Sequence, residues 1–385
     1  MQYTLNQLGW DNHWQNLFER IATAHRNSIP ARIARVNRSE YIILSEFGEG
    51  RAFLPGSFID SCLDPSEFPT IGDWILVDGA QDLRTPFRVQ SLLPRRNAFT
   101  RQVMGRNNEG RRTSSQFIAS NVDYYMLLFG LDHKISVRLV ERYLTLVTSS
   151  GSQAVIVLSK SDLQSDPEEY TDMLRPIAGD APICTVSALN NERLDRISTY
   201  IREGKTVAFL GSSGVGKTTL INAILGGEVL KMGAVRQKDL RGRHTTTWRE
   251  MIVVPQGGII IDTPGMREVK LHGDESSLEQ SFSDIHEIAS RCHFTNCSHH
   301  GEPGCAIEAA LREGTLTTYR YDSFLMLKNE TRFAQKQESA RHVMQVEKAK
   351  RKMKERAQNK DRSERRTSKV IMRNFRVEEY KDDLY

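Results

Sequence analysis

The hydrophobic residues of this chain follow two different patterns, one between residues 28 and 98 and another from residue 121 onward. Between residues 28 and 98, short runs alternate apolar and polar side chains, as at 31–36 and around 41–44, a further strand is expected at 72–77 after a turn, and Gly48–Gly50 is an expected turn. Alternation of this kind is typical of half-buried strands. About five strands within about 70 residues favour a small five-stranded barrel of the oligonucleotide-binding type.

From residue 121 onward the hydrophobic runs become continuous and alternate with stretches of helical period. Continuous runs are typical of parallel strands buried on both faces, and helices that alternate with them predict a doubly wound α/β sheet. The expected strands cover residues 122–129, 154–158, 181–186, 206–210 and 258–261, and the expected helices cover 136–149, 166–178, 190–203 and 219–225.

Two further segments flank the expected barrel. Residues 1–25 space Trp10, Trp14 and Phe18 for a short amphipathic helix that packs on the next domain, and a loosely attached arm fits the same pattern. Residues 99–117 are rich in arginine, glycine and asparagine, which predicts a flexible basic loop that an anionic partner would order.

A phosphate-loop pattern, G-x-x-x-x-G-K-[ST], joins the strand at 206–210 to the helix at 219–225. It consists of Gly211, Ser212, Ser213, Gly214, Val215, Gly216, Lys217 and Thr218, and Thr219 follows it. The glycines let backbone N–H groups wrap phosphates, and the start of the next helix adds partial positive charge. Lys217 can reach the β- and γ-phosphates, and the Thr218 hydroxyl can bind Mg²⁺.

Candidate guanine-binding residues follow two of the expected strands. Ser159-Lys160-Ser161-Asp162 resembles the pattern [NT]-K-x-D, with Ser159 in place of Asn or Thr. The Asp162 carboxylate would accept from the N1–H and amine of guanine, a donor pair that adenine lacks. Ser187-Ala188 stands where a backbone N–H would meet the guanine oxygen. These loops indicate GTP rather than ATP.

Switch elements follow the phosphate loop. Asp262-Thr263-Pro264-Gly265 is a D-x-x-G element, in which Asp262 would hold Mg²⁺ through water and the Gly265 N–H would sense the γ-phosphate. One residue of Thr245-Thr246-Thr247 would complete the first switch. Met266 stands where many GTPases carry a water-orienting Gln, so His244 becomes the candidate for that role beside Lys217, and packing or partner binding is its alternative role.

The order of these elements is unusual, because the guanine loops precede the phosphate loop, whereas most GTPases place them after it. The domain therefore has the order of a circular permutation, which is tolerable since domain termini often lie close together. The second switch then leads directly into the C-terminal region, which can respond to the nucleotide state.

A cysteine cluster lies in that region, where three of the five cysteines fall within residues 292–305. This pattern suits a metal site in a reducing compartment better than disulfides. Cys292, Cys297 and Cys305 with one histidine make a tetrahedral zinc set, and a site with four protein ligands is structural. The rival histidines are His293, His299 and His300.

Taken together, these motifs resemble the circularly permuted GTPases that depend on the small ribosomal subunit, the RsgA or YjeQ family. The resemblance extends from about residue 28 to 328 and includes Gly-Arg-His-Thr-Thr-Thr at 242–247 and Asp-Thr-Pro-Gly-Met-Arg-Glu at 262–268. It implies an N-terminal oligonucleotide-binding barrel, GTP hydrolysis on the 30S subunit late in its maturation, and a zinc domain in which His299 is the histidine ligand. Ser159 and a long basic tail depart from the family pattern.

Composition and charge agree with such a protein. Of the 385 residues 39% are hydrophobic and 26% charged, which allows two or three domains, and neither an apolar run of 18 residues nor a signal peptide is seen. Residues 346–369 carry eleven basic and four acidic side chains and predict a disordered segment or a solvated helix that binds RNA phosphates. A nucleic-acid surface is also plausible at the barrel arginines, which are Arg32, Arg35, Arg38, Arg51, Arg84, Arg88, Arg95 and Arg96.

We therefore expect a multidomain chain: an N-terminal arm and barrel at 1–98, a permuted phosphate-loop GTPase at 99–272, a mostly α zinc domain at 273–328 and a basic tail at 329–385. The expected function is GTP hydrolysis stimulated by the 30S subunit and coupled to 16S rRNA binding, with Mg²⁺ and one structural Zn²⁺, in a cytoplasmic monomer without membrane contact. The alternative is a GTP-gated RNA-binding factor in which hydrolysis is incidental.

Overall fold

The computed structural model describes residues 2–22, 27–37, 40–62, 67–78, 85–107, 110–227, 230, 250–255, 257–263, 275–333, 335, 336 and 339. The chain divides into two compact units, Met1–Ala334 and Gln335–Tyr385. Three helical residues of the second unit are described, and the barrel, the large sheet and the cysteine cluster belong to the first. The expected first switch with His244, the glycine Gly265 and the basic segment 346–369 lie outside the described residues.

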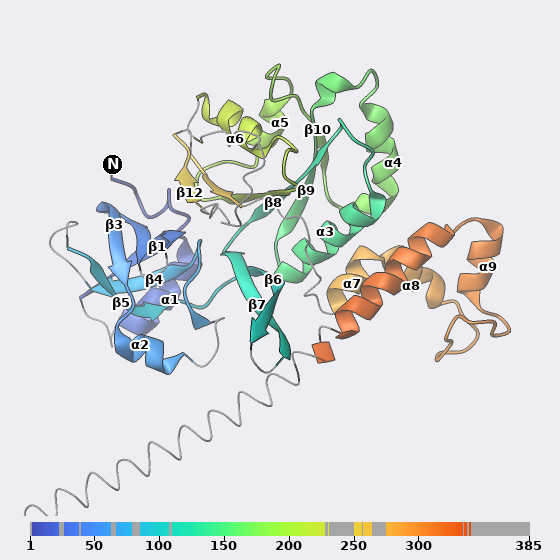
Figure 1. The fold of residues 1–385 in the computed structure, drawn as a ribbon, viewed down its shortest axis with the longest axis horizontal. Helices are drawn as coiled ribbons and strands as arrows, with labels where there is room; N and C mark the ends of the chain where they lie inside the picture. The colour runs from blue at the N-terminus through green and yellow to red at the C-terminus, as the bar shows by residue number, and fades with distance from the viewer. Residues whose placement is uncertain are drawn as a thin grey trace, which may run out of the picture. The chain divides into compact units, whose positions relative to one another are not determined.

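The N-terminal part of the first unit is a closed five-stranded barrel of order β1-β2-β3-β5-β4, as the alternating pattern predicts (Figure 1). Its elements are β1 (Ser28–Val36), β2 (Tyr41–Ser45), β3 (Gly48–Phe53), α2 (Gly56–Ser61), β4 (Trp74–Asp78) and β5 (Phe87–Leu92). Ile33, Ile43, Ile75 and Phe87 fill its interior and are at most 1% exposed.

One turn of the barrel differs from the prediction. The prediction of a turn at Gly48–Gly50 is wrong, because these residues lie in β3 and the turn falls on the two residues before them. A Cβ atom on Gly50 would lie 2.9 Å from the ring of Phe87. This glycine therefore makes room for a core aromatic ring inside a strand.

The N-terminal segment forms a helix that packs on the barrel, so the prediction of an amphipathic helix is confirmed over that of a loosely attached arm. Helix α1 (Asn12–Ala22) begins after Asp11, whose carboxylate accepts the N–H groups of His13 and Trp14. Trp14 is 1% exposed, and Trp10 meets Trp74 of β4 edge to face with 4.7 Å between ring centroids. Burial of three indole rings holds this segment in place.

The central part is a six-stranded sheet of order β10-β9-β8-β11-β13-β12. Its strands are β8 (Tyr124–Gly130), β9 (Gln153–Ser159), β10 (Ile183–Thr185), β11 (Thr206–Gly211), β12 (Glu250–Val253) and β13 (Ile259–Asp262). All neighbouring pairs are parallel except β12 with β13. The hydrophobic pattern does not predict β12, because a four-residue edge strand is too short to show a period.

Helices cover both faces of this sheet, which confirms the doubly wound arrangement (Figure 1). They are α3 (Val137–Ser150), α4 (Glu168–Ala178), α5 (Leu194–Ser198) and α6 (Lys217–Leu225). Ala208 and Leu210 of β11 pack in one core with α3 and α4, whereas Val207 and Phe209 pack in another with α5 and α6. Alternate residues of one strand therefore serve opposite faces.

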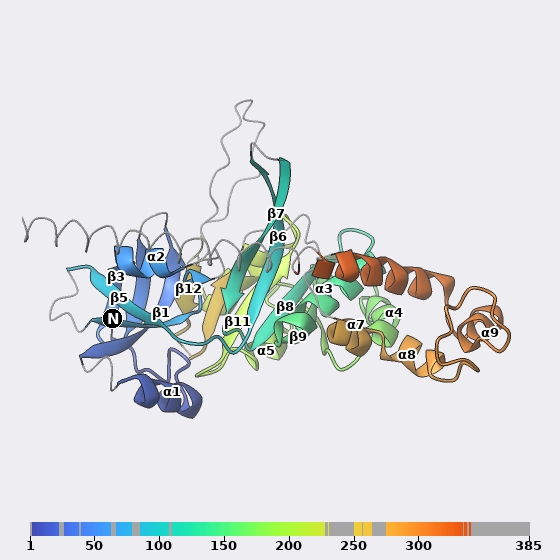
Figure 2. The same cartoon turned by 90° about the horizontal axis from the view of Figure 1, so that it is seen from below.

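A hairpin of β6 (Ala98–Asn107) and β7 (Gly110–Ser120) lies between barrel and sheet in the sequence (Figures 1 and 2). The prediction of a loop over residues 99–117 is therefore wrong. The two strands pair antiparallel along their length, from Ala98 with Ser120 to Asn107 with Gly110. Backbone pairing does not depend on hydrophobic content, so a polar and glycine-containing composition conceals it.

The C-terminal part of the first unit is mostly helical in its described residues, as predicted (Figure 2). It contains α7 (Glu275–Ser281), α8 (Ser283–Ala289), α9 (Ala306–Glu313) and a helix over residues 318–333. Arg320 of the last helix links this part to the sheet domain through Glu141 of α3, and it also pairs with Asp284 of α8. This helix continues past residue 328, where the sequence analysis ends the zinc domain.

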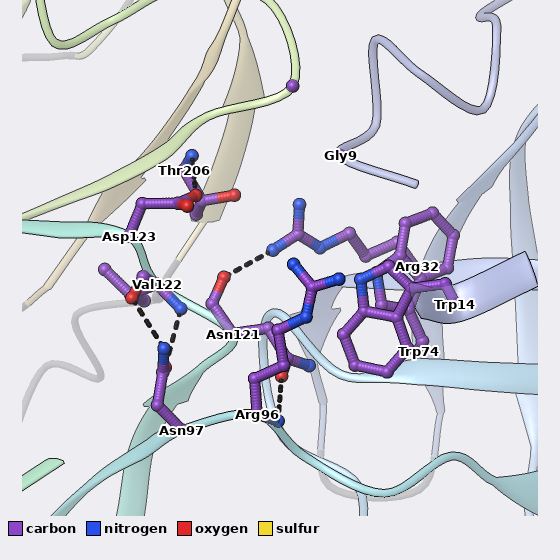
Figure 3. A pocket seen from close by; sticks show the side chains of 11 residues that line it. Gly9, Trp14, Arg32, Trp74, Arg96, Asn97, Asn121, Val122, Asp123 and Thr206 are labelled. Carbon is purple, nitrogen blue, oxygen red and sulfur yellow. Dashed lines mark hydrogen bonds between the residues drawn. The ribbon is translucent and has the colours of Figure 1, made fainter. Parts of the chain in front are cut away.

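Arg32 of β1 joins the N-terminal segment, the barrel and the sheet domain at one point (Figure 3). Its guanidinium donates to the carbonyl oxygens of Leu8 at 2.6 Å, Gly72 at 3.1 Å and Asn121 at 2.9 Å. Complete burial lowers the pKa of Arg32 to about 10, although Asp123 and Asp73 act against this change. The barrel is thereby anchored to the start of the α/β domain.

Candidate functional site

The phosphate-loop residues lie at the carboxyl end of β11, between this strand and α6. Gly214 and Gly216 have φ of +85° and +95°, which a residue with a Cβ rarely adopts. A Cβ on Gly211 would meet the carbonyl oxygen of Leu128 at 2.9 Å. Ser212, Ser213 and Gly214 are exposed, so their backbone groups are accessible to a phosphate at the N-terminus of α6.

Lys217 and Asp262 lie at this same edge of the sheet. Asp262 ends β13 opposite Phe209 of β11, and the hydroxyl of Thr263 donates to the Phe209 carbonyl. Burial lowers the pKa of Lys217, and the charge of Asp262 raises it. Burial raises the pKa of Asp262, with Lys217 acting to lower it and Glu250 to raise it. The cationic Lys217 and the anionic Asp262 therefore both lie at the phosphate-loop edge of the sheet.

Oxygen atoms that could bind a divalent cation are present at this edge of the sheet. Thr218, in the first turn of α6, offers a hydroxyl, and Asp262 offers a carboxylate. Hard oxygen donors of this kind, completed by phosphate and water, suit Mg²⁺. The burial that raises the pKa of Asp262 is also relieved by a bound cation, so the residues present fit the ion.

Ser159, the departure from the guanine-loop pattern, connects that loop to the phosphate loop. It ends β9, is 3% exposed, and its hydroxyl donates to the carbonyl oxygen of Val215 at 2.7 Å. The hydroxyl therefore holds together two segments that are 56 residues apart in sequence.

Lys160 adopts the left-handed conformation, with φ of +59°, directly after Ser159. Its Nζ pairs with Asp132 at 2.5 Å, and its Cε lies 4.0 Å from where a Cβ on Gly216 would be. The aliphatic stem thus runs beside the phosphate loop, as expected for a residue that covers a bound base.

Asp162 and Ser187 are brought together from separate loops, as the sequence analysis expects. The Ser187 hydroxyl donates to Asp162 Oδ1, and the N–H of Ser161 donates to Val186 at 3.1 Å. Ser187 itself is buried, and its N–H donates to the carbonyl of Glu192 at 3.2 Å. Of the pair Ser187-Ala188, the N–H of Ala188 is therefore the candidate donor to guanine.

Sequence reasoning does not identify Asp132, and it identifies Val215 and Ser187 as site residues without their side-chain and carbonyl contacts. Val215 contributes its carbonyl to Ser159, Asp132 pairs with Lys160, and the Ser187 side chain orients Asp162. Asp132 follows the strand end of β8, and a polar residue after a buried strand is the one signal that could have indicated it.

The cysteine cluster is assembled from the segment between α8 and α9. The ligand atoms of Cys292, Cys297, His299 and Cys305 all lie within 4.8 Å of one another. His299 Nδ1 is 3.6 Å from the sulfur of Cys292 and 3.5 Å from that of Cys305. His293 and His300 do not belong to this group of four.

These distances fit zinc. Tetrahedral geometry with Zn–S of about 2.3 Å and Zn–N of about 2.0 Å separates sulfur from nitrogen by about 3.5 Å. Burial raises the pKa of the Cys292 thiol, but hydrogen bonds from the N–H groups of Ala306 and Ile307, at the start of α9, help to lower it, and the net change in the pKa is downward. A helix N-terminus therefore supports a thiolate at this site.

Arginines of the barrel have partners within the protein wherever the structure describes them, although the side chains of Arg51 and Arg88 remain about half exposed. Arg32 is buried at the junction with the sheet domain. The others pair with carboxylates, namely Arg35 with Glu250, Arg51 with Glu40, Arg88 with Asp78, Arg95 with Asp73 and Arg96 with Asp11. Arg38 and Arg84 lie outside the described residues.

Known proteins resemble this chain over most of its length. The family model described as RsgA GTPase matches residues 92–272. The small ribosomal subunit biogenesis GTPase RsgA of Opitutus terrae is 38% identical over 340 residues, which cover 86% of this chain and 90% of that protein. The protein of the same name from Leptospira interrogans is 41% identical over 303 residues, with coverage of 78% and 82%.

A second family model, that of ABC transporters, matches residues 194–384. This range includes the phosphate loop, which ATP- and GTP-binding proteins share, and excludes the guanine-loop residues 159–162. It therefore does not alter the choice of base.

Solved structures agree in fold. YjeQ from Thermotoga maritima has 22% sequence identity and a TM-score of 0.58, and the match covers 79% of this chain and 98% of that one. YloQ, described as a circularly permuted GTPase, has 23% identity and a TM-score of 0.56, with coverage of 80% and 96%. Among the described residues no helix has the length and apolar character needed to cross a membrane.

Proposed function

Because this chain belongs to the RsgA family of GTPases, we propose that it hydrolyses GTP in response to the small ribosomal subunit and acts in the late maturation of that subunit. The observation that carries this is the junction of loops at the carboxyl edge of the sheet. There Ser159 ties the guanine loop to Val215, and Ser187 orients Asp162. Family membership favours this function over a GTP-gated RNA binder in which hydrolysis is incidental.

In this proposal each loop has a separate task. Asp162 accepts from the guanine edge, the Lys160 stem covers the base, and the Ala188 N–H donates to the guanine oxygen. Residues Gly211 to Lys217 bind the phosphates through backbone N–H groups at the start of α6 and through the Lys217 ammonium group, which lies beside the loop and donates to the Gly211 carbonyl. Thr218 and Asp262 hold Mg²⁺, which neutralises charge that develops on the phosphates.

The assignment of the remaining residues follows the sequence. We assign Thr219 and Gly265 to nucleotide binding, one of Thr245, Thr246 and Thr247 to the first switch, and His244 to positioning of the attacking water. Cys292, Cys297, His299 and Cys305 hold a structural zinc ion. The domains keep the proposed limits of 1–98, 99–272, 273–328 and 329–385.

The proposed partners are the 30S subunit with its 16S rRNA, and GTP or GDP, for a monomer in the cytoplasm. Since the described barrel arginines are paired internally, we assign the electrostatic part of RNA binding chiefly to the basic tail. Eleven basic side chains in residues 346–369 support this assignment.

Nucleotide specificity tests the guanine-binding part of this proposal. GDP should displace a fluorescent guanine nucleotide from the purified protein at least about 100-fold better than ADP, because adenine leaves the Asp162 carboxylate without donors. Lys217→Ala should weaken the binding of both GDP and ADP. Asp162→Ala should weaken only the binding of GDP and so reduce the discrimination between the two bases. Equal displacement by ADP and GDP in the wild-type protein would contradict the proposal.

A further inference from the structure

Strand β12 is the part of the large sheet that meets the barrel (Figures 1 and 2). At its first residue, Glu250 forms an ion pair with Arg35 of β1. The two side chains are 40% and 34% exposed, so water screens the pair in part. No other ion pair between barrel and sheet is found among the described residues.

Glu250 is also registered directly opposite Asp262 in the antiparallel pair of β12 and β13. Opposite residues of such a pair project from the same face with Cβ atoms about 5 Å apart, and like charges so placed repel. Lys217 acts on Asp262 from the phosphate loop, and Glu250 acts on it from the other strand. From the phosphate loop to the barrel the charges are therefore positive at Lys217, negative at Asp262 and Glu250, and positive at Arg35.

The contact between Arg35 and Glu250 borders open space. A groove of about 240 Å³ separates the two elements there, and Leu44 of the barrel and Met251 of β12 line it as well. The Arg32 anchor, in contrast, is only 1% exposed. The Arg35–Glu250 pair can consequently change its geometry while the anchor remains intact.

We propose that Arg35 and Glu250 are positioning residues for the magnesium site. Through Arg35, the barrel determines how much of the negative charge of Glu250 acts on Asp262. This inference rests on the proposed role of Asp262 as a magnesium-binding carboxylate. With Arg35 in place, the charge of Glu250 is largely neutralised. When an anionic partner such as an RNA phosphate draws Arg35 away, Glu250 adds a negative charge beside Asp262 and strengthens cation binding.

The coupling is reciprocal by thermodynamic linkage. A divalent cation at Asp262 attracts Glu250 and repels Arg35, so the loaded site weakens the contact that holds the barrel to β12. Bound nucleotide and magnesium thus weaken the contact between the barrel and β12 by the same factor by which loss of this contact raises the affinity for magnesium. Both effects pass through one ion pair and one register position.

The test measures Mn²⁺ binding to the GDP-bound full-length protein by electron paramagnetic resonance, because Mn²⁺ accepts the same oxygen ligands as Mg²⁺. R35Q should bind Mn²⁺ about two- to five-fold more tightly, and E250Q about two- to five-fold more weakly, for a partly exposed pair. The double variant R35Q/E250Q should return to within about 1.5-fold of the wild type, since it removes both charges. As a matched control, R88Q removes an arginine whose partner, Asp78, lies within the barrel, and should change nothing.

The charge swap R35E/E250R separates electrostatics from loss of the barrel contact. It keeps an ion pair across the junction but places a positive charge opposite Asp262, so Mn²⁺ binding should fall further than in E250Q. Shifts of R35Q and E250Q in the same direction, or no shift in either, would overturn the inference if Asp262→Asn still weakens Mn²⁺. Unchanged Mn²⁺ binding in Asp262→Asn would instead overturn the proposed magnesium site, and the inference with it.

Discussion

The hydroxyl of Ser159 joins the guanine loop to the phosphate loop, since it donates to the carbonyl of Val215 at 2.7 Å. The sequence shows only that Asn or Thr is replaced, and a replacement of this kind suggests a weaker loop. In the folded chain the serine is 3% exposed and fully engaged. Its short side chain suffices because the end of β9 brings the backbone of the phosphate loop within reach.

Removal of this hydroxyl should weaken nucleotide binding. Ser159→Ala leaves the Val215 carbonyl without its partner, which costs about 1–2 kcal/mol and should weaken GDP binding about ten-fold. Ser159→Thr keeps the hydroxyl and should stay within about two-fold of the wild type. Titration with a fluorescent GDP analogue measures both variants, and an unaltered affinity of Ser159→Ala would refute the role of this bond.

His244 carries the prediction that concerns hydrolysis alone. His244→Ala should abolish the hydrolysis that a partner stimulates and leave GTP affinity within about two-fold, because a water-positioning group acts on the transition state only. His13→Ala, which alters an exposed histidine of α1, is the control and should behave as the wild type. Stimulated rates that survive in His244→Ala would end this assignment.

At the scale of elements, the parallel strands are the most predictable part of this fold, because a strand buried on both faces needs a continuous apolar run. The run that forms β8 and the run that forms β11 show this directly. The hairpin β6–β7 could not be predicted in the same way, because its cohesion comes from backbone pairing. Strand β12 is too short for a period, and it carries Glu250, the residue that meets the barrel.

The cysteine cluster shows the same limit for a site. Spacing in the sequence identifies three thiols and leaves three histidines in competition, whereas the fold places His299 beside Cys292 and Cys305. His299 has φ of +62°, a backbone conformation that turns this residue toward the thiols and that sequence spacing does not reveal.

Removal of zinc should unfold the segment around the cysteine cluster and leave the sheet domain folded. A chelator, or Cys292→Ala, should expose the segment 291–305 to protease while GDP binding persists, because the nucleotide residues lie on the sheet. His299→Ala should lose the metal, and His300→Ala should retain about one zinc ion per chain. A protein that is fully folded through residue 328 with far less zinc would contradict the site.

The ion pair of Arg320 with Glu141 predicts a strong effect on stability. The Glu141 side chain is fully buried, so Arg320→Met leaves an unpaired charge and should lower the free energy of unfolding by about 3–5 kcal/mol. Arg291→Ala removes an exposed pair with Glu287 and should cost at most about 0.5 kcal/mol. Urea denaturation compares the two, and equal losses would show that Glu141 does not depend on Arg320.

At the scale of the whole molecule, the sheet domain is bound to its neighbours by charged side chains at defined points. Arg32 anchors the barrel, Arg35 reaches Glu250 beside the nucleotide edge, and Arg320 fixes the C-terminal helices to α3. In the proposed coupling, a change at the nucleotide reaches the barrel through Asp262, Glu250 and Arg35.

The central claim is that this chain is a GTPase which the small ribosomal subunit stimulates. The most direct test measures GTP hydrolysis by the full-length protein alone, with isolated 30S subunits and with isolated 50S subunits, at several salt concentrations. We expect slow hydrolysis by the protein alone, strong stimulation by 30S subunits only, and a steep fall in stimulation as salt rises, because contacts with RNA phosphates release counterions. Hydrolysis that neither subunit accelerates, or that 50S subunits accelerate equally, would contradict the account.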